Sequence, residues 1–300
     1  MTKTIDTLIQ DMHEVLEQGV EVDKVKDHLS IFQDNMLSTL RRQLTPKGGK
    51  GYLRMSALGQ PCPRKLWFDV NLDHDDELSE KLSGDTKLKF MYGDLTEELV
   101  LLVASIAGHR VEGVQGVCEI NGVKGHRDAI IDGELIDVKS ASQFGFLKFK
   151  DHKLEEDDPF GYMIQIMCYL FSSQDDPLLV NKDRASFLAF DKQSGKMCLD
   201  TYDKPSWFDK IPELVEKRKL QVNQKDLPDR GFEPVPDGKS GNMKLPMNCS
   251  YCARKFRCHD NIRTFVSSRG PVYLTEVKRE PRMLEIDGLT GEKITKEDGS

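Results

Sequence analysis

The sequence lacks an excess of positive charge, and it lacks any long hydrophobic run. Its 300 residues carry 43 Lys and Arg against 50 Asp and Glu, a net charge of −7, which excludes a protein that wraps DNA with a uniformly basic surface. A basic groove on one face is still allowed, because net charge averages over all faces. The longest mainly apolar segment, residues 99–107, is far shorter than the roughly 20 residues of a membrane-spanning helix. The first residues also lack the apolar core of a secretion signal, so we expect an intracellular, cytoplasmic protein.

Cysteine is sparse and unevenly placed, with seven residues in all. An odd number without an export signal argues against a disulfide framework. Cys249, Cys252 and Cys258 lie within ten positions, and reduced thiols at this density usually hold a metal ion or a cluster. Cys62 is the natural candidate for a fourth ligand, while His259 leaves a zinc site of three cysteines and one histidine open. We interpret the remaining cysteines as small core residues: Cys118, Cys168 and Cys198.

Hydrophobic periodicity predicts a chain of both helices and strands. Residues 1 to about 44 have helical spacing and are followed by a glycine-rich linker to residue 51. A long apolar helix is expected from about residue 87 to 107. The segments 111–119, 123–131 and 134–139 alternate and are separated by turn residues, which is typical of antiparallel strands. Farther along we expect, in order, an apolar helix, a hairpin, a helix and a loop: 160–171, 185–202, 207–222 and 226–246.

Two carboxylates and a lysine stand on either side of one predicted turn. Asp128 precedes the turn Asp132-Gly133, and Asp137 and Lys139 follow it. Antiparallel strands joined there would bring the two carboxylates together, and residues two apart in a strand share one face. Clustered carboxylates repel one another unless a cation lies between them, and their hard oxygens suit Mg²⁺ or Mn²⁺. An exposed hairpin with solvated charges is the simpler interpretation of the triplet alone.

The neighbouring helices add further polar candidates. Glu97 lies on the apolar stripe of the helix at 95–107, where a carboxylate needs a partner. Glu98 is the competing candidate, and we favour Glu97. Gln165 and Tyr169 are four apart and share one face of the next apolar helix. Both could offer hydrogen bonds to a phosphate or a base, but taken by themselves they are better explained as a satisfied polar pair in a mostly apolar helix.

The order of these pieces is that of a known family. A Gly-x-x-x-Glu helix, an isolated Asp, an Asp-x-Lys triplet and a Gln-x-x-x-Tyr helix resemble the PD-(D/E)xK nuclease superfamily, and most of all its RecB-type exonuclease branch. The resemblance covers about residues 52–262, and the four motifs together are far more specific than any one of them. It departs from the branch at Glu97, where many members have histidine, and at Arg127, where proline is common.

This resemblance implies a fold, a metal site and roles for residues. The fold class is α/β, restriction-endonuclease-like, with a mixed central sheet flanked by helices and an N-terminal helical extension. The implied catalytic residues are Glu97, Asp128, Asp137 and Lys139. The implied ligands of Mg²⁺ or Mn²⁺ are Glu97, Asp128, Asp137 and the carbonyl of Val138. Lys139 would serve the attacking water, and Gln165 and Tyr169 would position the DNA strand.

The cysteines strengthen the resemblance. One cysteine before the core and three after it are similar to the arrangement in iron–sulfur nucleases, namely AddB-type domains and CRISPR-associated RecB-like exonucleases. This implies a [4Fe-4S] cluster, with zinc as the alternative, held by Cys62, Cys249, Cys252 and Cys258. Such a clip would join the ends of the nuclease domain and remove much entropy from the unfolded chain. We expect an N-terminal region and linker at 1–51, the nuclease domain at 52–262 and a loosely attached, partly flexible tail at 263–300.

Basic and aromatic side chains alternate after the Asp-x-Lys strand: Phe144, Phe146, Lys148, Phe149, Lys150 and Lys153. Such side chains bind phosphates and stack the bases of a single strand. The resemblance implies that the protein is a metal-dependent DNA exonuclease acting on single-stranded ends in replication, recombination or repair. An endonuclease of the same superfamily, or a non-catalytic module that binds DNA or a partner protein, is the alternative. The chain has no helicase P-loop, so any unwinding would come from a partner such as a helicase. No membrane partner is expected.

Overall fold

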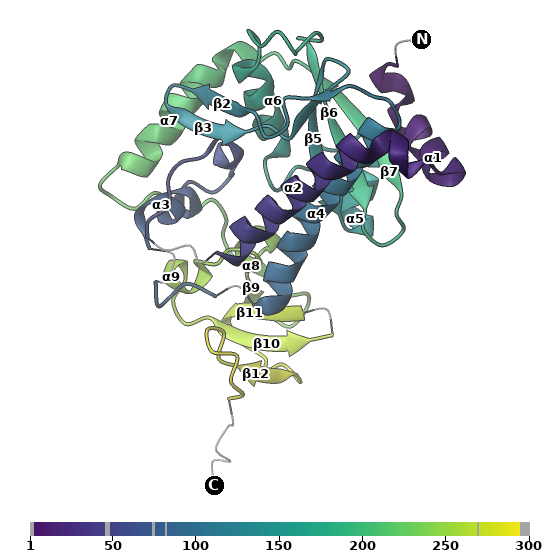
Figure 1. Cartoon of the computed structure of the whole chain (residues 1–300). Helices are drawn as coiled ribbons and strands as arrows, with labels where there is room; N and C mark the ends of the chain where they lie inside the picture. Colours follow the sequence, from purple (N-terminus) through teal and green to yellow (C-terminus); the bar gives the residue numbers. More distant parts are fainter. Residues whose placement is uncertain (1–2, 46–48, 74–75, 82, 269, 295–300) are drawn as a thin grey trace. The chain divides into compact units, whose positions relative to one another are not determined.

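The computed structural model describes residues 3–45, 49–73, 76–81, 83–268 and 270–294 (Figure 1). The chain divides into two compact units, each assembled from separate stretches of sequence. The first unit consists of Met1–Pro46, Leu53–Gly59 and Gly84–Arg218. The second unit consists of Lys47–Tyr52, Gln60–Ser83 and Lys219–Ser300.

A five-stranded mixed sheet lies at the centre of the first unit, with the strand order β1-β4-β5-β6-β7. Its strands are β1 (Val111–Glu112), β4 (Ala129–Ile131), β5 (Glu134–Ala141), β6 (Arg184–Asp191) and β7 (Met197–Asp203). Only β5 and β6 are parallel among these neighbours. A parallel pair needs a crossover connection, which the helices α5 (Gln143–Lys150) and α6 (Tyr162–Ser172) supply. The strands β2 (Val117–Ile120) and β3 (Val123–His126) form a separate hairpin.

Helices cover both faces of this sheet. On one face, α1 (Leu8–Gln18) and α4 (Gly84–Ile106) bury Leu8, Met12 and neighbouring residues against β5 and β6. On the other face, α5, α6 and the start of α7 (Ile211–Asn223) enclose a second apolar cluster. The helix α2 (Lys26–Leu44) packs along α4 (Figure 1). The predicted α/β class, with a mixed central sheet flanked by helices and an N-terminal helical region, is confirmed.

The second unit contains short helices and an antiparallel sheet. The helices are α3 (Pro63–Asn71), α8 (Met247–Ser250) and α9 (Lys255–Cys258). The sheet has the order β12-β10-β11-β9-β8. Its strands are β8 (Val235–Pro236), β9 (Met243–Lys244), β10 (Arg263–Ser267), β11 (Gly270–Glu276) and β12 (Leu284–Ile286).

The first unit also contains 3₁₀ turns at Ile5–Thr7, Val22–Val25, Met55–Ala57 and Phe208–Lys210.

The part of the chain after residue 263 differs from the loose tail that the sequence suggested. Three strands form there, and Phe265, Tyr273 and Leu274 are buried in their sheet. Glycine, proline and charged residues occur within these strands as well as between them, as at Arg263, Gly270 and Pro271. Four of the described helices were not expected from the sequence: α3, α5, α8 and α9. No helix among the described residues is long and apolar enough to cross a membrane.

Candidate active site

The turn between β4 and β5 brings two carboxylates together. Asp132 and Gly133 have φ values of +52° and +85°, the conformation of a two-residue hairpin turn. Across it, Ala129 pairs with Ile136. Asp128 directly precedes β4, and its Oδ2 accepts a hydrogen bond of 2.7 Å from the backbone N–H of Val138. Asp128 therefore lies beside the middle of β5, next to Asp137.

Asp137 and Lys139 lie on the face of β5 that is turned toward α6. Alternation places Leu135 in the cluster on this face and Ile136 and Val138 in the cluster on the other face. Asp137 is 1% exposed and forms an ion pair with Lys139. Its Oδ2 is the atom that contacts the Lys139 ammonium, although the geometry of that contact is not that of a hydrogen bond. A buried carboxylate oxygen in this state has lone pairs left for another partner.

The helix α4 brings a third carboxylate to the same place. Glu97 accepts a 2.7 Å hydrogen bond from Gln115 Nε2, and the backbone N–H of Gln115 donates to the carbonyl of Asp128 at 3.0 Å. Burial, and next the charges of Glu98, Asp137 and Asp94, raise the pKa of Glu97 to about 7. Burial, followed by the charges of Asp137 and Glu97, raises the pKa of Asp128 well above its ordinary value. Three acids thus crowd one partly enclosed site and disfavour one another's charge.

Lys139 keeps its proton in this setting. Burial opposes the charge of its ammonium group, but the carboxylates of Asp137 and Asp128 outweigh burial and raise the pKa of Lys139. The ammonium also lies 4.8 Å from the ring centroid of Tyr162, within the range of a cation–π contact. One protonated lysine cannot neutralise three carboxylates, so the fully ionised site has an excess of negative charge.

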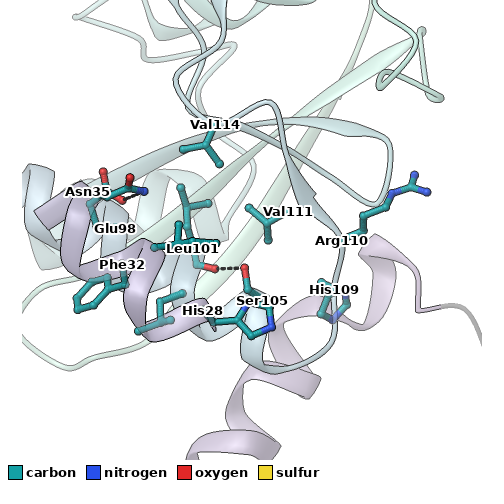
Figure 2. Close-up of a pocket in the computed structure, with 12 residues that line it drawn as sticks. His28, Phe32, Asn35, Glu98, Leu101, Ser105, His109, Arg110, Val111 and Val114 are labelled. Atoms are coloured by element: carbon teal, nitrogen blue, oxygen red, sulfur yellow. Dashed lines mark hydrogen bonds between the residues drawn. The ribbon is translucent and has the colours of Figure 1, made fainter. Parts of the chain in front are cut away.

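Glu98, the competing acid, is directed elsewhere. Its Oε2 accepts a 3.0 Å hydrogen bond from Asn35 on α2. It lines a cavity of about 310 Å³ between α2, α4 and the β1 segment, together with Phe32, Leu101 and Val111 (Figure 2). Adjacent residues of a helix differ by about 100° in direction, which separates the two glutamates. The structure brings Glu97, and not Glu98, to Asp128 and Asp137.

The two polar residues of α6 take different positions. Gln165 Nε2 donates to Asp137 Oδ1 at 3.3 Å. Tyr169 is only 3% exposed and lies against Gly125, where an added Cβ would be 2.9 Å from the tyrosine ring. Burial, and next the charges of Asp137 and Asp128, raise the pKa of Tyr169, while a hydrogen bond with Gln165 acts in the opposite direction. Tyr169 is thus a buried side chain whose hydrogen bond with Gln165 holds that side chain in place.

Sequence reasoning missed two residues of the site. Tyr162 lies one helical turn before Gln165 on α6, so the spacing that singled out Gln165 could have found it. Gln115 has a φ of +52°, and its side chain reaches Glu97 only because the loop turns sharply there. No pattern in the sequence marks this conformation.

Arg127, which directly precedes Asp128, has a structural role. It is 6% exposed and donates hydrogen bonds to Ser173 at 3.0 Å and to Asp176 at 2.5 Å. Added Cβ atoms at Gly113 and Gly116 would lie 2.7 Å and 2.8 Å from its guanidinium group. The buried arginine therefore anchors the backbone that carries Asp128.

The expected basic and aromatic surface requires a correction. Phe146 and Phe149 are each 4% exposed and belong to the core, so neither can stack a base. Phe149 packs edge-on against Phe187 on β6. The sequence interleaves these rings with lysines because α5 is amphipathic, with its rings divided between two faces. Phe144 alone of the three is exposed, at 73%.

Four cysteines come together within the second unit. Cys62 is the N-cap of α3, and its thiol accepts hydrogen bonds from the backbone N–H groups of Lys65 at 3.5 Å and Gly231 at 3.4 Å. Cys249 lies in α8, and Cys258 ends α9. The four cysteines and the predicted alternative ligand line one small cavity: Cys62, Cys249, Cys252, Cys258 and His259.

The chemistry of this cavity suits a thiophilic metal. Burial, and next the charges of Cys252, Cys62 and Cys258, raise the pKa of Cys249 to about 12. An added Cβ at Gly231 would lie 2.7 Å from the Cα of Cys62 and 3.2 Å from its sulfur, so glycine allows the backbone to approach the thiol. His259 is 5% exposed, and its Nε2 has no hydrogen-bond partner among the described residues. Four thiols and one unpartnered imidazole fit either an iron–sulfur cluster or zinc.

The remaining cysteines lie in the first unit. Cys118 and Cys168 are buried, while Cys198 is partly buried on β7. Within the described ranges, no three His, Cys, Asp or Glu side chains are spaced as a formed metal site. The fit of both candidate sites to a metal therefore rests on their donor atoms, on the buried Asp137 oxygen and on the unpartnered imidazole of His259.

Comparisons with known proteins give a distant structural likeness. No protein-family pattern matches the chain, and no curated protein matches it in sequence. One similar solved structure is that of a protein named only as SSO0001. It is 15% identical, with a TM-score of 0.39, over 76% of this chain and 95% of the other chain.

Proposed function

We propose that this protein is a metal-dependent DNA exonuclease of the PD-(D/E)xK superfamily, with a restriction-endonuclease-like fold. It would hydrolyse phosphodiester bonds from the ends of single-stranded DNA. The proposal is carried by one observation: Glu97, Asp128 and Asp137 crowd together beside Lys139, so that their ionised carboxylates exceed the charge of that lysine. The order of the sequence motifs supplies the family and the substrate.

The donor set of the acidic site fits a hard divalent cation. Carboxylate oxygens are the ligands that Mg²⁺ and Mn²⁺ prefer. Asp137 Oδ2 is buried and contacts the ammonium of Lys139, and a carboxylate oxygen with one such contact keeps a lone pair for a cation. Glu97, Asp128, Asp137 and the carbonyl of Val138 would hold the cation. A bound cation supplies two effects, a lower pKa of water and charge neutralisation at the phosphate.

The side chains of the site then have distinct tasks. Lys139 carries a proton and lies beside Asp137, where it would orient the attacking water and stabilise negative charge on the phosphate. Gln165, held by Tyr169, would position the DNA strand. The water oxygen bonds to phosphorus, the bond from phosphorus to the 3′-oxygen breaks, and the leaving oxygen takes a proton.

The four-cysteine cavity would hold a structural [4Fe-4S] cluster, with zinc as the alternative. Cys62 lies 187 residues before Cys249 in the chain, so a shared metal would close a very long loop. In the acidic site the candidate donors are oxygens, and here they are sulfurs, so the two sites would select different metals. DNA is the proposed substrate, and a helicase or another replication or recombination protein is the proposed partner.

The proposal is tested with linear and circular single-stranded DNA in parallel, with Mn²⁺ or Mg²⁺ and with an EDTA control. We expect loss of linear DNA only, no loss with EDTA, and no loss with Lys139→Ala. Lys182→Ala is the matched control, because Lys182 contacts Gln174 and lies away from the acids. Cutting of both substrates would instead indicate an endonuclease. The absence of any cutting would indicate a non-catalytic binding module.

A further inference from the structure

An exposed aromatic ring lies close to the proposed catalytic lysine. Phe160 is 49% exposed, and its ring centroid lies 5.5 Å from that of Tyr162. The ring of Tyr162 in turn lies 4.8 Å from the ammonium of Lys139. A single exposed phenylalanine is ordinary on a protein surface. This one is separated by one ring from the group that would act on a phosphodiester bond.

The segment that carries Phe160 is held rigidly. The side chain of Asp158 accepts hydrogen bonds from the backbone N–H groups of Gly161, Tyr162 and Met163, at 2.9, 3.0 and 2.9 Å. Gly161 has a φ of +78°, and an added Cβ would lie 2.0 Å from the carbonyl oxygen of Gly59. The backbone on the C-terminal side of Phe160 is therefore fixed. An exposed ring on a fixed backbone loses little conformational entropy when it binds a ligand.

A second exposed ring lies near cationic side chains on the neighbouring helix. Phe144 on α5 is 73% exposed, and the ammonium of Lys148 lies 5.5 Å from its ring centroid. Lys148 also forms an ion pair of 2.6 Å with Asp157, three residues before Phe160. The Lys148–Asp157 ion pair thus connects the helix that carries Phe144 with the segment that carries Phe160.

We propose that Phe160 and Phe144 stack the bases of the single strand next to the bond that is cut. This inference rests on the proposed nuclease function and adds the residues that select single-stranded DNA. Aromatic rings bind unpaired bases of any sequence by stacking, while neighbouring lysines contact the phosphates. Paired bases in a duplex are already stacked and cannot cover an exposed ring. Phe160 would bind the base nearest Lys139, and Phe144 a base farther along.

The test measures equilibrium binding of fluorescent oligothymidine without added divalent metal, so that no DNA is cut. A second oligonucleotide of equal length has abasic sites in place of the bases. We expect Phe160→Ala to weaken binding of oligothymidine about tenfold, which corresponds to about 1.4 kcal/mol. Its binding of the abasic strand should not change. Phe160→Trp should restore the affinity, and Phe144→Ala should behave as Phe160→Ala does.

Leu16→Ala is the control variant, because Leu16 is 59% exposed on α1, on the opposite face of the sheet. An equal loss of affinity for intact and abasic strands, or no loss for either, would overturn the stacking proposal. The equal loss would mean that the substitution had disturbed Tyr162 and Lys139. The nuclease proposal fails separately, if wild-type protein binds the strand but does not degrade it with Mn²⁺. If cleavage does not depend on Phe160 or Phe144, the nuclease proposal stands and the stacking proposal is wrong.

Discussion

Glu97 and Glu98 are chemically identical neighbours whose surroundings differ. Glu97 is held by Gln115 and lies among the charges of the acidic site, whereas Glu98 is bonded to Asn35 and lines a separate cavity. The apolar stripe of α4 suggested this division. The residue type cannot distinguish the two glutamates, because it is the same at both positions. The contacts that distinguish them come from Gln115 and Asn35, which are distant in sequence.

The protonation of Glu97 predicts how the stability of the metal-free protein depends on pH. Burial and the nearby acids raise the pKa of Glu97 from 4.5 to about 7, so the folded state holds this proton more tightly than the unfolded chain does. The resulting stabilisation is complete below pH 4.5 and is lost as the pH rises through about 7. The shift corresponds to roughly 3 kcal/mol.

Glu97→Gln removes this titration, and urea denaturation in EDTA at several pH values measures the effect. We expect the free energy of unfolding of the variant, relative to that of wild type, to increase by roughly 3 kcal/mol between pH 4.5 and 8. Parallel stability curves for the two proteins would show that Glu97 is not buried among like charges.

At the scale of elements, the hairpin of β4 and β5 and the start of α6 build the site. The Asp132-Gly133 turn and the period of two in β5 were readable from the sequence, and both place Asp137 and Lys139 correctly on one face. The helix α5 was not readable, because Gly145 and several aromatic residues are weak helix formers. Without that helix, the sequence could not show that Phe146 and Phe149 point into the core.

The close approach of two backbones at the start of α6 gives a prediction on stability. Gly161→Ala would place a Cβ 2.0 Å from the carbonyl oxygen of Gly59, in addition to the cost of its φ of +78°. Gly195 has a similar φ of +72°, but nothing lies within 4 Å of an added Cβ there. We expect Gly195→Ala to destabilise by about 1 kcal/mol and Gly161→Ala by about 3 kcal/mol.

Chemical denaturation measures the free energy of unfolding of Gly161→Ala and Gly195→Ala. Because the two glycines have similar φ values, the difference between the variants is the cost of the clash with the Gly59 carbonyl. The Gly161→Ala variant should also lose DNA cleavage, since Tyr162 follows directly. Equal destabilisation of the two variants would mean that the Gly59 carbonyl moves freely and that the loop before α6 is not fixed.

At the scale of the whole molecule, the metal-binding side chains of the two sites could be predicted from the sequence, whereas the fold of the segment after residue 263 could not. Three closely spaced cysteines and a distant fourth indicated one cluster, and Cys62 lies in the same cavity as the other three. The strands after residue 263 were missed, because their composition resembles that of loops, although β10 and β11 pair as neighbours in the sequence. Only the packing of Phe265 and Leu274 distinguishes them from a tail.

The cysteine cavity predicts a bound metal that depends on its thiols. Cys249→Ser should lose the iron or zinc of the purified protein and lower the melting temperature by several degrees. Cys198→Ser is the control, because Cys198 lies on β7 in the first unit. Elemental analysis and visible absorbance after anaerobic purification measure both the amount and the kind of metal. Wild-type protein free of iron and zinc, or a Cys249→Ser variant with a full complement, contradicts this assignment.

The central claim is that Glu97, Asp128 and Asp137 form a cation-dependent catalytic site for cutting DNA. The most direct test compares Glu97→Gln with Glu98→Gln in the rate of degradation of linear single-stranded DNA with Mn²⁺. Both substitutions remove one carboxylate from the same turn of α4, so any general effect on the helix is shared. We expect Glu97→Gln to reduce the rate by about 100-fold or more and Glu98→Gln to stay within about twofold of wild type. Equal rates for the two variants, or a greater loss with Glu98→Gln, would contradict the site.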